Sequence, residues 1–313
     1  MIDDLIQGIK NKKVRSISKA ITLIENNNKS SSKILSKLYP LNNHTHRIGI
    51  TGPPGAGKST ITNLLIKYFR ENKQSVAVLL VDPTSPYSNG AVLGDRIRMY
   101  NHYNDNNVFI RSFATRGSKG GLSKNINEIA DVLQAAKYDI ILFETVGVGQ
   151  VEIDVVEQVD SVVLTLVPES GDDIQMMKAG IIEIADIFVI NKSDRKDANK
   201  LYASLKNMLS LIKIDKKKKW FPEIVKTIAT EDKGIRELMD ILKAHNKQIN
   251  KDNKTIKSNF RYSKQVHSLI KNHLNKDFWT NTKKIILNKE LSKDINQRQS
   301  PLKLVDKIIK NDE

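Results

Sequence analysis

Apolar runs of strand length alternate with amphipathic stretches through the middle of the chain. The amphipathic stretches, such as Leu122–Lys137 and Ala198–Leu211, carry apolar residues at three- and four-residue intervals, which predicts helices. Strands that alternate with helices form a mostly parallel, doubly wound α/β sheet, whose ligand-binding loops gather at the carboxyl ends of the strands. The seven predicted strands are Arg47–Thr51, Ser75–Asp82, Val108–Phe113, Tyr138–Glu144, Ser161–Val167, Asp186–Asn191 and Glu223–Ile228.

The two ends of the chain have helical patterns without strands. The stretch from about Ile2 to Leu38 is predicted to be helical, and so is the chain from Phe260 onward. Between the last strand and that tail, Asn246–Asn259 has the composition of a polar connector. We therefore expect an N-terminal helical extension over residues 1–44, an α/β domain over residues 45–250 and a C-terminal helical extension over residues 251–313.

Composition narrows the class of protein. With 313 residues, of which 39% are hydrophobic, the chain can bury a full core. No apolar run approaches the ~18 residues that a membrane-spanning helix needs. There is no cysteine, and the N-terminus carries Asp3 and Asp4 instead of a signal-type apolar segment. These features together predict a cytoplasmic protein.

The net charge of +16 is concentrated at the ends of the chain. Residues 1–50 carry a net charge of +6, residues 51–210 a net charge of −2, and residues 211–313 a net charge of +12. These flanks are rich in Lys and poor in aromatic residues, which favours solvated helix faces over a base-stacking surface. The run Lys216–Lys219 is interpreted first as a linker or solvated turn, and second as a patch for an anionic partner. A nucleic-acid-associated protein stays an alternative, and it predicts RNA binding that weakens steeply with salt.

A complete GxxxxGK[ST] phosphate-binding loop occupies residues 52–59, Gly-Pro-Pro-Gly-Ala-Gly-Lys-Ser. It lies between a predicted strand and a helical pattern that starts at Ser59, so backbone N–H groups and the helix dipole face a bound anion. In such a loop Lys58 reaches the β- and γ-phosphates and the Ser59 hydroxyl ligates Mg²⁺. The residues predicted to bind the nucleotide phosphates are Gly52, Pro53, Gly55, Ala56, Gly57, Lys58, Ser59 and Thr60.

A second motif, NKxD, follows the sixth predicted strand at residues 191–194. In P-loop GTPases this motif binds guanine. The carboxylate of Asp194 can accept both the N1–H and the exocyclic amine of guanine, a donor pair that adenine lacks. Lys192 would lay its aliphatic stem on the base, and Asn191 completes the motif. GTP is therefore predicted in preference to ATP.

Two acidic residues end strands beside the phosphate loop. Asp82 ends the second predicted strand and Glu144 the fourth. Glu144 occupies the place of the Asp in the GTPase DxxG element, so it can hold Mg²⁺ or its water, and the Gly147 N–H can meet the γ-phosphate. Asp82 would ligate the metal or position its water. The alternative for either residue is a carboxylate that caps a loop.

Six further strings, together with these two motifs, resemble the methylmalonyl-CoA mutase-associated GTPase chaperones of MeaB/ArgK type, which are SIMIBI-like P-loop GTPases. The resemblance covers roughly residues 45–245. The strings are residues 82–88 (Asp-Pro-Thr-Ser-Pro-Tyr-Ser), 93–99 (Leu-Gly-Asp-Arg-Ile-Arg-Met), 115–118 (Thr-Arg-Gly-Ser), 120–122 (Gly-Gly-Leu), 144–150 (Glu-Thr-Val-Gly-Val-Gly-Gln) and 171–175 (Gly-Asp-Asp-Ile-Gln).

The resemblance implies a GTP-hydrolysing chaperone of an adenosylcobalamin-dependent acyl-CoA mutase. In that family GTP binding and hydrolysis gate cofactor delivery from a cobalamin adenosyltransferase, and members are homodimers with helical extensions. It implies Lys58, Asp82, Asp95 and Glu144 as catalytic residues. It implies Ser59, Asp82, Asp95 and Glu144 as the Mg²⁺ site, and a mobile switch over Gly171–Lys178 that touches the mutase. The C-terminal extension is the expected dimerisation region, and a dimer contact through the G domains is the alternative.

The sequence departs from common GTPase patterns in three places. Val148 stands after Gly147, where Ras-type GTPases have a water-orienting Gln, so slow hydrolysis is predicted unless a partner completes the site. Lys119 replaces an apolar residue that is common in the family. Thr227–Thr230 stands where GTPases often show Ser-Ala, so only a backbone contact of Ala229 to the base is predicted.

Two other enzyme and carrier classes are alternatives on the same P-loop. A kinase would transfer phosphate to an acceptor, but the sequence has no separate acceptor-binding domain, and NKxD favours a switch. A nickel chaperone is disfavoured because no His-rich or Cys-rich tract is present.

Overall fold

The computed structural model describes residues 2–26, 28–39, 45–82, 99–114, 125–145, 156–169, 185–211, 220–249, 251–294 and 297–310. The chain divides into two compact units, Met1–Lys257 and Ser258–Glu313. The larger unit contains the sheet and both nucleotide motifs. Each unit is therefore described by itself.

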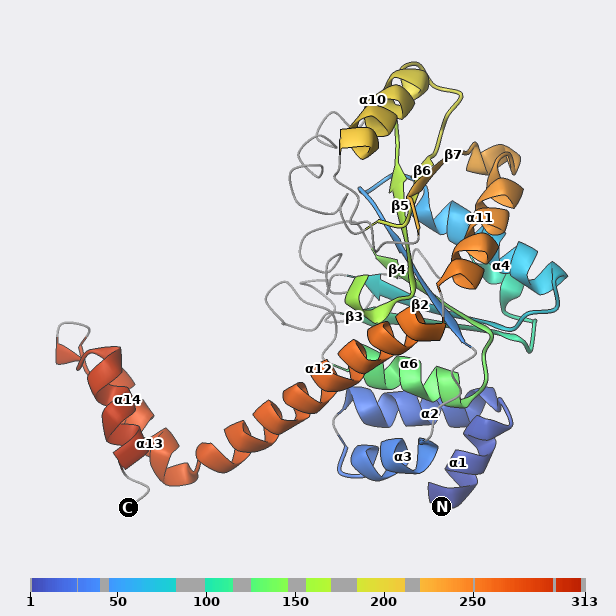
Figure 1. Ribbon diagram of the computed structural model, residues 1–313. Coiled ribbons are helices and arrows are strands. Elements are labelled where there is room, and N and C mark those ends of the chain that lie inside the picture. The colour runs from blue at the N-terminus through green and yellow to red at the C-terminus, as the bar shows by residue number, and fades with distance from the viewer. Residues whose placement is uncertain are drawn as a thin grey trace. The chain divides into compact units, whose positions relative to one another are not determined.

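A seven-stranded sheet is the centre of the larger unit, in the order β3-β2-β4-β1-β5-β6-β7 (Figure 1). Every pair of neighbouring strands is parallel. This is the P-loop type of α/β fold that the sequence predicts, and each predicted strand is present with ends within two residues of the prediction. The strands are β1 His46–Thr51, β2 Val76–Asp82, β3 Val108–Ala114, β4 Ile140–Thr145, β5 Ser161–Leu166, β6 Ile187–Ile190 and β7 Glu223–Lys226.

Helices cover both faces of the sheet, which is why the central strands are continuous apolar runs. All residues of β1, β4, β5 and β6 are buried. On one face pack α4 (Lys58–Glu71) and α11 (Ile235–Gln248), and on the other α6 (Ile126–Ala135) and α10 (Ala198–Leu211). Two short 3-10 helices, η1 (Tyr100–His102) and η2 (Ala229–Glu231), belong to the loops.

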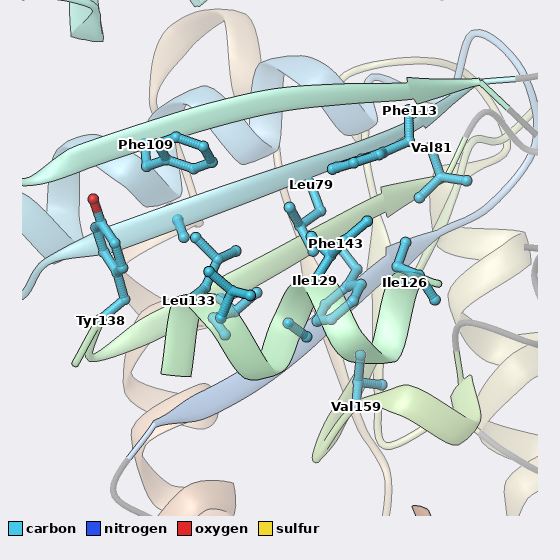
Figure 2. Close-up of a cluster of buried hydrophobic side chains, with 14 of the residues drawn as sticks. Leu79, Val81, Phe109, Phe113, Ile126, Ile129, Leu133, Tyr138, Phe143 and Val159 are labelled. Carbon is cyan, nitrogen blue, oxygen red and sulfur yellow. The ribbon is translucent and has the colours of Figure 1, made fainter. Parts of the chain in front are cut away.

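The α6 face shows how the core is built. Figure 2 shows strand side chains meeting the apolar stripe of α6, so the aromatic rings of β3 and β4 fill the space between sheet and helix. The labelled residues from the strands are Leu79, Val81, Phe109, Phe113 and Phe143, and those from α6 are Ile126, Ile129 and Leu133.

Three N-terminal helices stack on α6 and complete this core. They are α1 (Ile2–Lys10), α2 (Val14–Glu25) and α3 (Ser31–Leu38). Their apolar residues, such as Ile9, Ile21 and Ile34, belong to the same hydrophobic cluster as the strands (Figure 1). The side-chain amide of Asn125, just before α6, donates to the Ile24 carbonyl, and Arg111 of β3 pairs with Glu25.

A buried ion pair ties β1 to α6 below the nucleotide motifs. The Arg47 guanidinium lies 2.9 Å from an Asp131 carboxylate oxygen, and both side chains are almost fully buried. The same guanidinium donates to Gln134 at 2.8 Å and to Asn127 at 3.1 Å. Because the donors of the cation are shared among three acceptors on one helix, the pair fixes the register of α6 on the sheet.

The prediction of a polar connector at Asn246–Asn259 was wrong. Helix α11 continues to Gln248, and α12 begins at Lys251 and runs to Phe278. No Gly or Pro occurs between Ile235 and Ser300, so the stretch contains no strong helix breaker, and a polar composition alone does not prevent a helix. The Lys257 ammonium of α12 donates to the Asp160 carbonyl at 2.6 Å.

The smaller unit contains the rest of α12 with α13 (Asn281–Leu291) and α14 (Pro301–Lys310). Thr280 caps α13 by accepting the Lys283 N–H, and Glu290 pairs with Lys293 at 2.8 Å. Leu302 of α14 is 80% exposed, and Val305 and Ile309 are about half exposed. Among the described residues, no helix has the length and apolar character needed to cross a membrane.

Candidate functional site

The phosphate loop joins the end of β1 at Thr51 to the start of α4 at Lys58. Three of its glycines have positive φ: 139° at Gly52, 76° at Gly55 and 91° at Gly57. A Cβ on Gly52 would lie 2.0 Å from the Thr165 carbonyl oxygen, so the loop passes directly against β5. Glycine is thus required here both for the backbone conformation and for close approach.

Lys58 curls over the loop that precedes it. Its Nζ donates to the carbonyl oxygens of Gly52 and Pro53, both at 2.8 Å. The ammonium is therefore held at the opening of the loop, where the first turn of α4 also directs free N–H groups. Thr60, the third residue of α4, is exposed. This arrangement presents a fixed positive charge to an anion.

The side chains of Ser59 and Glu144 are hydrogen-bonded beside the phosphate loop. The Ser59 hydroxyl donates to Glu144 Oε1 at 2.5 Å, and both residues are more than nine-tenths buried. β1 and β4 are neighbours, with Ile50 opposite Glu144, so the strand ends bring the carboxylate to the first turn of α4. Two hard oxygen donors at a phosphate loop fit Mg²⁺, which takes few protein ligands and fills its shell with phosphate and water oxygens.

The other predicted metal and switch residues are only partly described. The backbone of Asp82 ends β2, whose residues Leu80 and Val81 pair with Glu144 and Thr145 of β4. Asp82 thus lies at the same edge of the sheet as Glu144. Asp95, Gly147, Val148 and the segment Gly171–Lys178 lie outside the described residues, as do Lys119 and Lys216–Lys219. Within the described ranges, no three His, Cys, Asp or Glu side chains cluster as a metal site.

Asn191 connects the two nucleotide motifs. Its Nδ2 donates to the Ala56 carbonyl of the phosphate loop at 2.8 Å. Its Oδ1 accepts the Thr227 hydroxyl at 3.0 Å and the Ala229 N–H at 3.1 Å. One buried amide therefore holds together the phosphate loop, the NKxD turn and the loop after β7, and it does so through contacts within the protein.

Lys192 and Asp194 follow Asn191 in a turn at the carboxyl end of β6. Lys192 has a left-handed backbone with φ of 56°, its side chain is partly exposed, and Asp194 is exposed. The Ser193 N–H donates to the Thr227 carbonyl at 3.0 Å, which orders the turn against the loop after β7. The structure thus brings the NKxD turn and Ala229 beside the phosphate loop.

The sequence did not indicate Thr227 as a site residue. Its hydroxyl supplies one of the two donors to Asn191 Oδ1, and its carbonyl accepts from Ser193. A threonine after a short strand carries no pattern of its own, and the partner is 36 residues away in the chain. Only the three-dimensional structure, in which Thr227 lies beside the NKxD turn, shows that it orders this turn.

The sequence profile of the family described as "Methylmalonyl Co-A mutase-associated GTPase MeaB" matches residues 17–283. The chain belongs to this family. It is accordingly a GTPase, and its ligands are guanine nucleotides. The match confirms the family that the six strings and the two motifs predicted.

Relatives of the family from distant organisms are similar over most of the chain. A putative GTPase of Pyrococcus horikoshii is 48% identical over 272 residues, which cover 86% of each protein. A mouse protein named "Methylmalonic aciduria type A homolog, mitochondrial" is 36% identical over 265 residues, covering 79% of this chain and 64% of the mouse protein. The Escherichia coli GTPase ArgK is 35% identical over 228 residues, covering 71% of this chain and 69% of ArgK.

The fold of the family is also found in a solved structure described as an LAO/AO transport system kinase. The two structures have a TM-score of 0.69 and 24% sequence identity, over 99% of this chain and 97% of the other. At that identity the likeness shows only that the two proteins share the P-loop NTPase fold and its helical extensions. The description as a kinase is a statement about the other protein.

Proposed function

We propose that this GTPase is a chaperone of an adenosylcobalamin-dependent acyl-CoA mutase of the methylmalonyl-CoA mutase type. In this proposal GTP hydrolysis gates the loading of the cofactor and protects or reactivates the mutase. The family description, which names association with that mutase, supports the proposal. The mouse relative's name, which refers to methylmalonic aciduria, points in the same direction.

The observation that carries the nucleotide assignment is the hydrogen bond from Asn191 Nδ2 to the Ala56 carbonyl. This bond supports the assignment because it holds the first residue of the predicted guanine motif against the phosphate loop, so that one bound nucleotide would contact both motifs. We assign the phosphates to Gly52–Thr60 and Gly147, and the base to Asn191, Lys192, Asp194 and the Ala229 backbone. Asp194 would supply the guanine preference through its paired acceptor oxygens.

The chemistry of the phosphate end follows from two of its side chains. Lys58, now bonded to the Gly52 and Pro53 carbonyls, can direct its charge at the phosphate oxygens without leaving the loop. Ser59 can offer an oxygen lone pair to a cation while its hydroxyl still donates a hydrogen bond to Glu144. Magnesium, held by Ser59 and Glu144 with Asp82 and Asp95, would neutralise charge that develops on the phosphates.

In this proposal the γ-phosphate orders the segments around Asp82–Asp95, Glu144–Gln150 and Gly171–Lys178, and hydrolysis releases them. Val148 gives the chain no Ras-type glutamine after Gly147, so the bound mutase would complete the hydrolytic site. A cobalamin adenosyltransferase is the proposed source of the cofactor. We further propose a homodimer formed through the C-terminal helices, whose Leu302, Val305 and Ile309 are exposed.

The test is GTP hydrolysis measured with and without the mutase of the host organism, in its cofactor-free form. We expect slow turnover alone and clear stimulation by the mutase. The Lys58→Ala variant is the matched control, because it should bind GTP poorly and stay inactive with the mutase present. Unchanged hydrolysis on addition of the mutase, or phosphate transfer to an acceptor, would contradict the chaperone proposal.

A further inference from the structure

Besides Asn191, a second set of contacts joins the phosphate-binding helix to the loop after β7. This loop, residues 227–234, contains Thr227 and Ala229 and ends in Gly234 before α11. The carboxylate of Asp232 is held by two consecutive residues of α4. The Tyr68 hydroxyl donates to its Oδ1 at 3.0 Å, and the Lys67 ammonium donates to its Oδ2 at 3.0 Å.

The loop is built as a rigid turn around Asp232. Ile228 and Lys233 exchange both backbone hydrogen bonds, at 3.1 Å and 3.2 Å, and the Asp232 N–H donates to the Ala229 carbonyl at 3.3 Å. Asp232 has a left-handed backbone with φ of 57°. Because the turn is closed by these bonds, a force on the Asp232 carboxylate is transmitted to Ala229, three residues earlier.

The α4 side of the contact is equally fixed. The Tyr68 ring is 8% exposed and belongs to the hydrophobic cluster between α4, α11 and the sheet. The Arg236 guanidinium of α11 lies 5.7 Å from the centre of the same ring. The hydroxyl is thus presented from a packed side chain on the helix that begins at Lys58, so the turn and the phosphate loop share one rigid element.

We propose that Asp232, through Tyr68 and Lys67, is a positioning residue for recognition of the guanine base. It sets the distance of the Ala229 N–H and the NKxD turn from the phosphate loop. The inference rests on the proposed base site at Asn191 and Asp194. Binding groups have to be held within about 0.5 Å of their working position, and the contacts of Asp232 to α4 add to those of Asn191 in holding this loop.

The contact is poorly suited to a purely stabilising role. The Lys67 side chain is 49% exposed and that of Asp232 is 32% exposed. Ion pairs this open to solvent contribute little to folding stability. Their value is in direction, because the carboxylate has one donor on each oxygen and therefore one preferred orientation.

The experiment compares three ligands by calorimetry: GDP, ADP and inorganic pyrophosphate, each with magnesium. The first variant is Asp232→Asn, which keeps side-chain size and suits a positive φ. The second is Tyr68→Phe, which removes one partly buried hydroxyl. For both we expect GDP to bind about three- to tenfold more weakly. Pyrophosphate should bind as in the parent protein, and the preference for GDP over ADP should fall.

The matched control is Asp105→Asn. Asp105 also pairs with α4, through Arg70 Nε at 2.7 Å, but it lies between η1 and β3, and its other hydrogen bonds in the described structure are to residues 102–108. This variant should leave the GDP-to-ADP preference unchanged. The double variant Tyr68→Phe with Asp232→Asn should lose less GDP affinity than the two single losses combined, since both changes act on the contact between Asp232 and α4.

Several results would overturn the inference. Equal weakening of GDP and pyrophosphate would show that the contact serves the phosphate loop, and unchanged GDP affinity would show that it serves neither. If Asp232→Asn does not fold, Lys67→Met and Tyr68→Phe decide by the same criteria. An Asp194→Asn variant measured in parallel separates the two levels: if its GDP-to-ADP preference is unchanged, the base site itself is misassigned.

Discussion

Two glycines of the phosphate loop have the same kind of backbone but different surroundings. Gly55 and Gly57 both have left-handed φ, 76° and 91°. A Cβ on Gly55 would meet nothing within 4 Å, whereas a Cβ on Gly57 would lie 2.2 Å from Asn191 Nδ2. Replacing each by alanine therefore imposes a similar backbone strain, and only Gly57→Ala displaces the amide that joins the two nucleotide motifs.

The expected magnitudes differ accordingly. Gly55→Ala should cost the strain of one left-handed residue, about 1 to 2 kcal/mol of unfolding free energy. Gly57→Ala also breaks the hydrogen bonds of the Asn191 side chain to the Ala56 carbonyl and the Ala229 N–H. Each of these two backbone groups costs about 1 to 3 kcal/mol when it is buried without a partner. The sum for Gly57→Ala is about 3 to 8 kcal/mol.

The assay is urea unfolding of both variants without nucleotide, followed by circular dichroism. Leaving nucleotide out removes any clash of the new methyl groups with phosphate. Asn191→Ala should cost less stability in the Gly57→Ala background than in the parent protein, because the new methyl group has already displaced the Asn191 amide from its partners. Equal losses for Gly55→Ala and Gly57→Ala would refute the reasoning that Asn191 is held against the loop.

Three further outcomes are expected. Asp194→Asn should relax the preference for guanine, measured as the ratio of GDP to ADP affinity by calorimetry; an unchanged ratio would count against the base assignment. Arg47→Met should lower the unfolding free energy by about 3 to 5 kcal/mol, because the buried Asp131 loses its cation, and Arg47→Met with Asp131→Leu should recover most of it in the same urea titration. Burial raises the pKa of Tyr138 to about 12 from 10.0, so the folded state favours the neutral phenol. The stability that this group contributes is fully present below pH 10, and about 2 to 3 kcal/mol of it is lost as the pH rises to about 12. The Tyr138→Phe variant should not show this alkaline loss in unfolding titrations. A parallel decline in both proteins would exclude Tyr138 as the source of the loss.

The sheet could be predicted from the sequence because its strands are buried on both faces. Such strands are uninterrupted apolar runs, and β1, β4, β5 and β6 differ from their predicted ranges only at the ends. The C-terminal helix α12 was missed between Lys251 and Asn259 for the opposite reason: its first turns are polar, so hydrophobic periodicity gives no signal there.

The nucleotide site was predictable where chemistry is encoded in consecutive residues. The loop at residues 52–59 and the NKxD turn are local patterns, and the parallel sheet brings their strand ends to one edge. The tethers between them are not local. Tyr68 and Asp232 are 164 residues apart, and neither residue type is unusual on a helix or in a turn. Only the packing of α4 beside the β7–α11 loop makes them partners.

The three helices that precede β1 are built into the catalytic domain instead of decorating it. Ile9, Ile21 and Ile34 belong to the same hydrophobic core as Phe109 and Phe113, so a shortened chain that begins at His46 would expose that core to water. We expect a chain trimmed to a minimal G domain in this way to aggregate. The buried positions of these three helices should accordingly accept only apolar substitutions of similar volume.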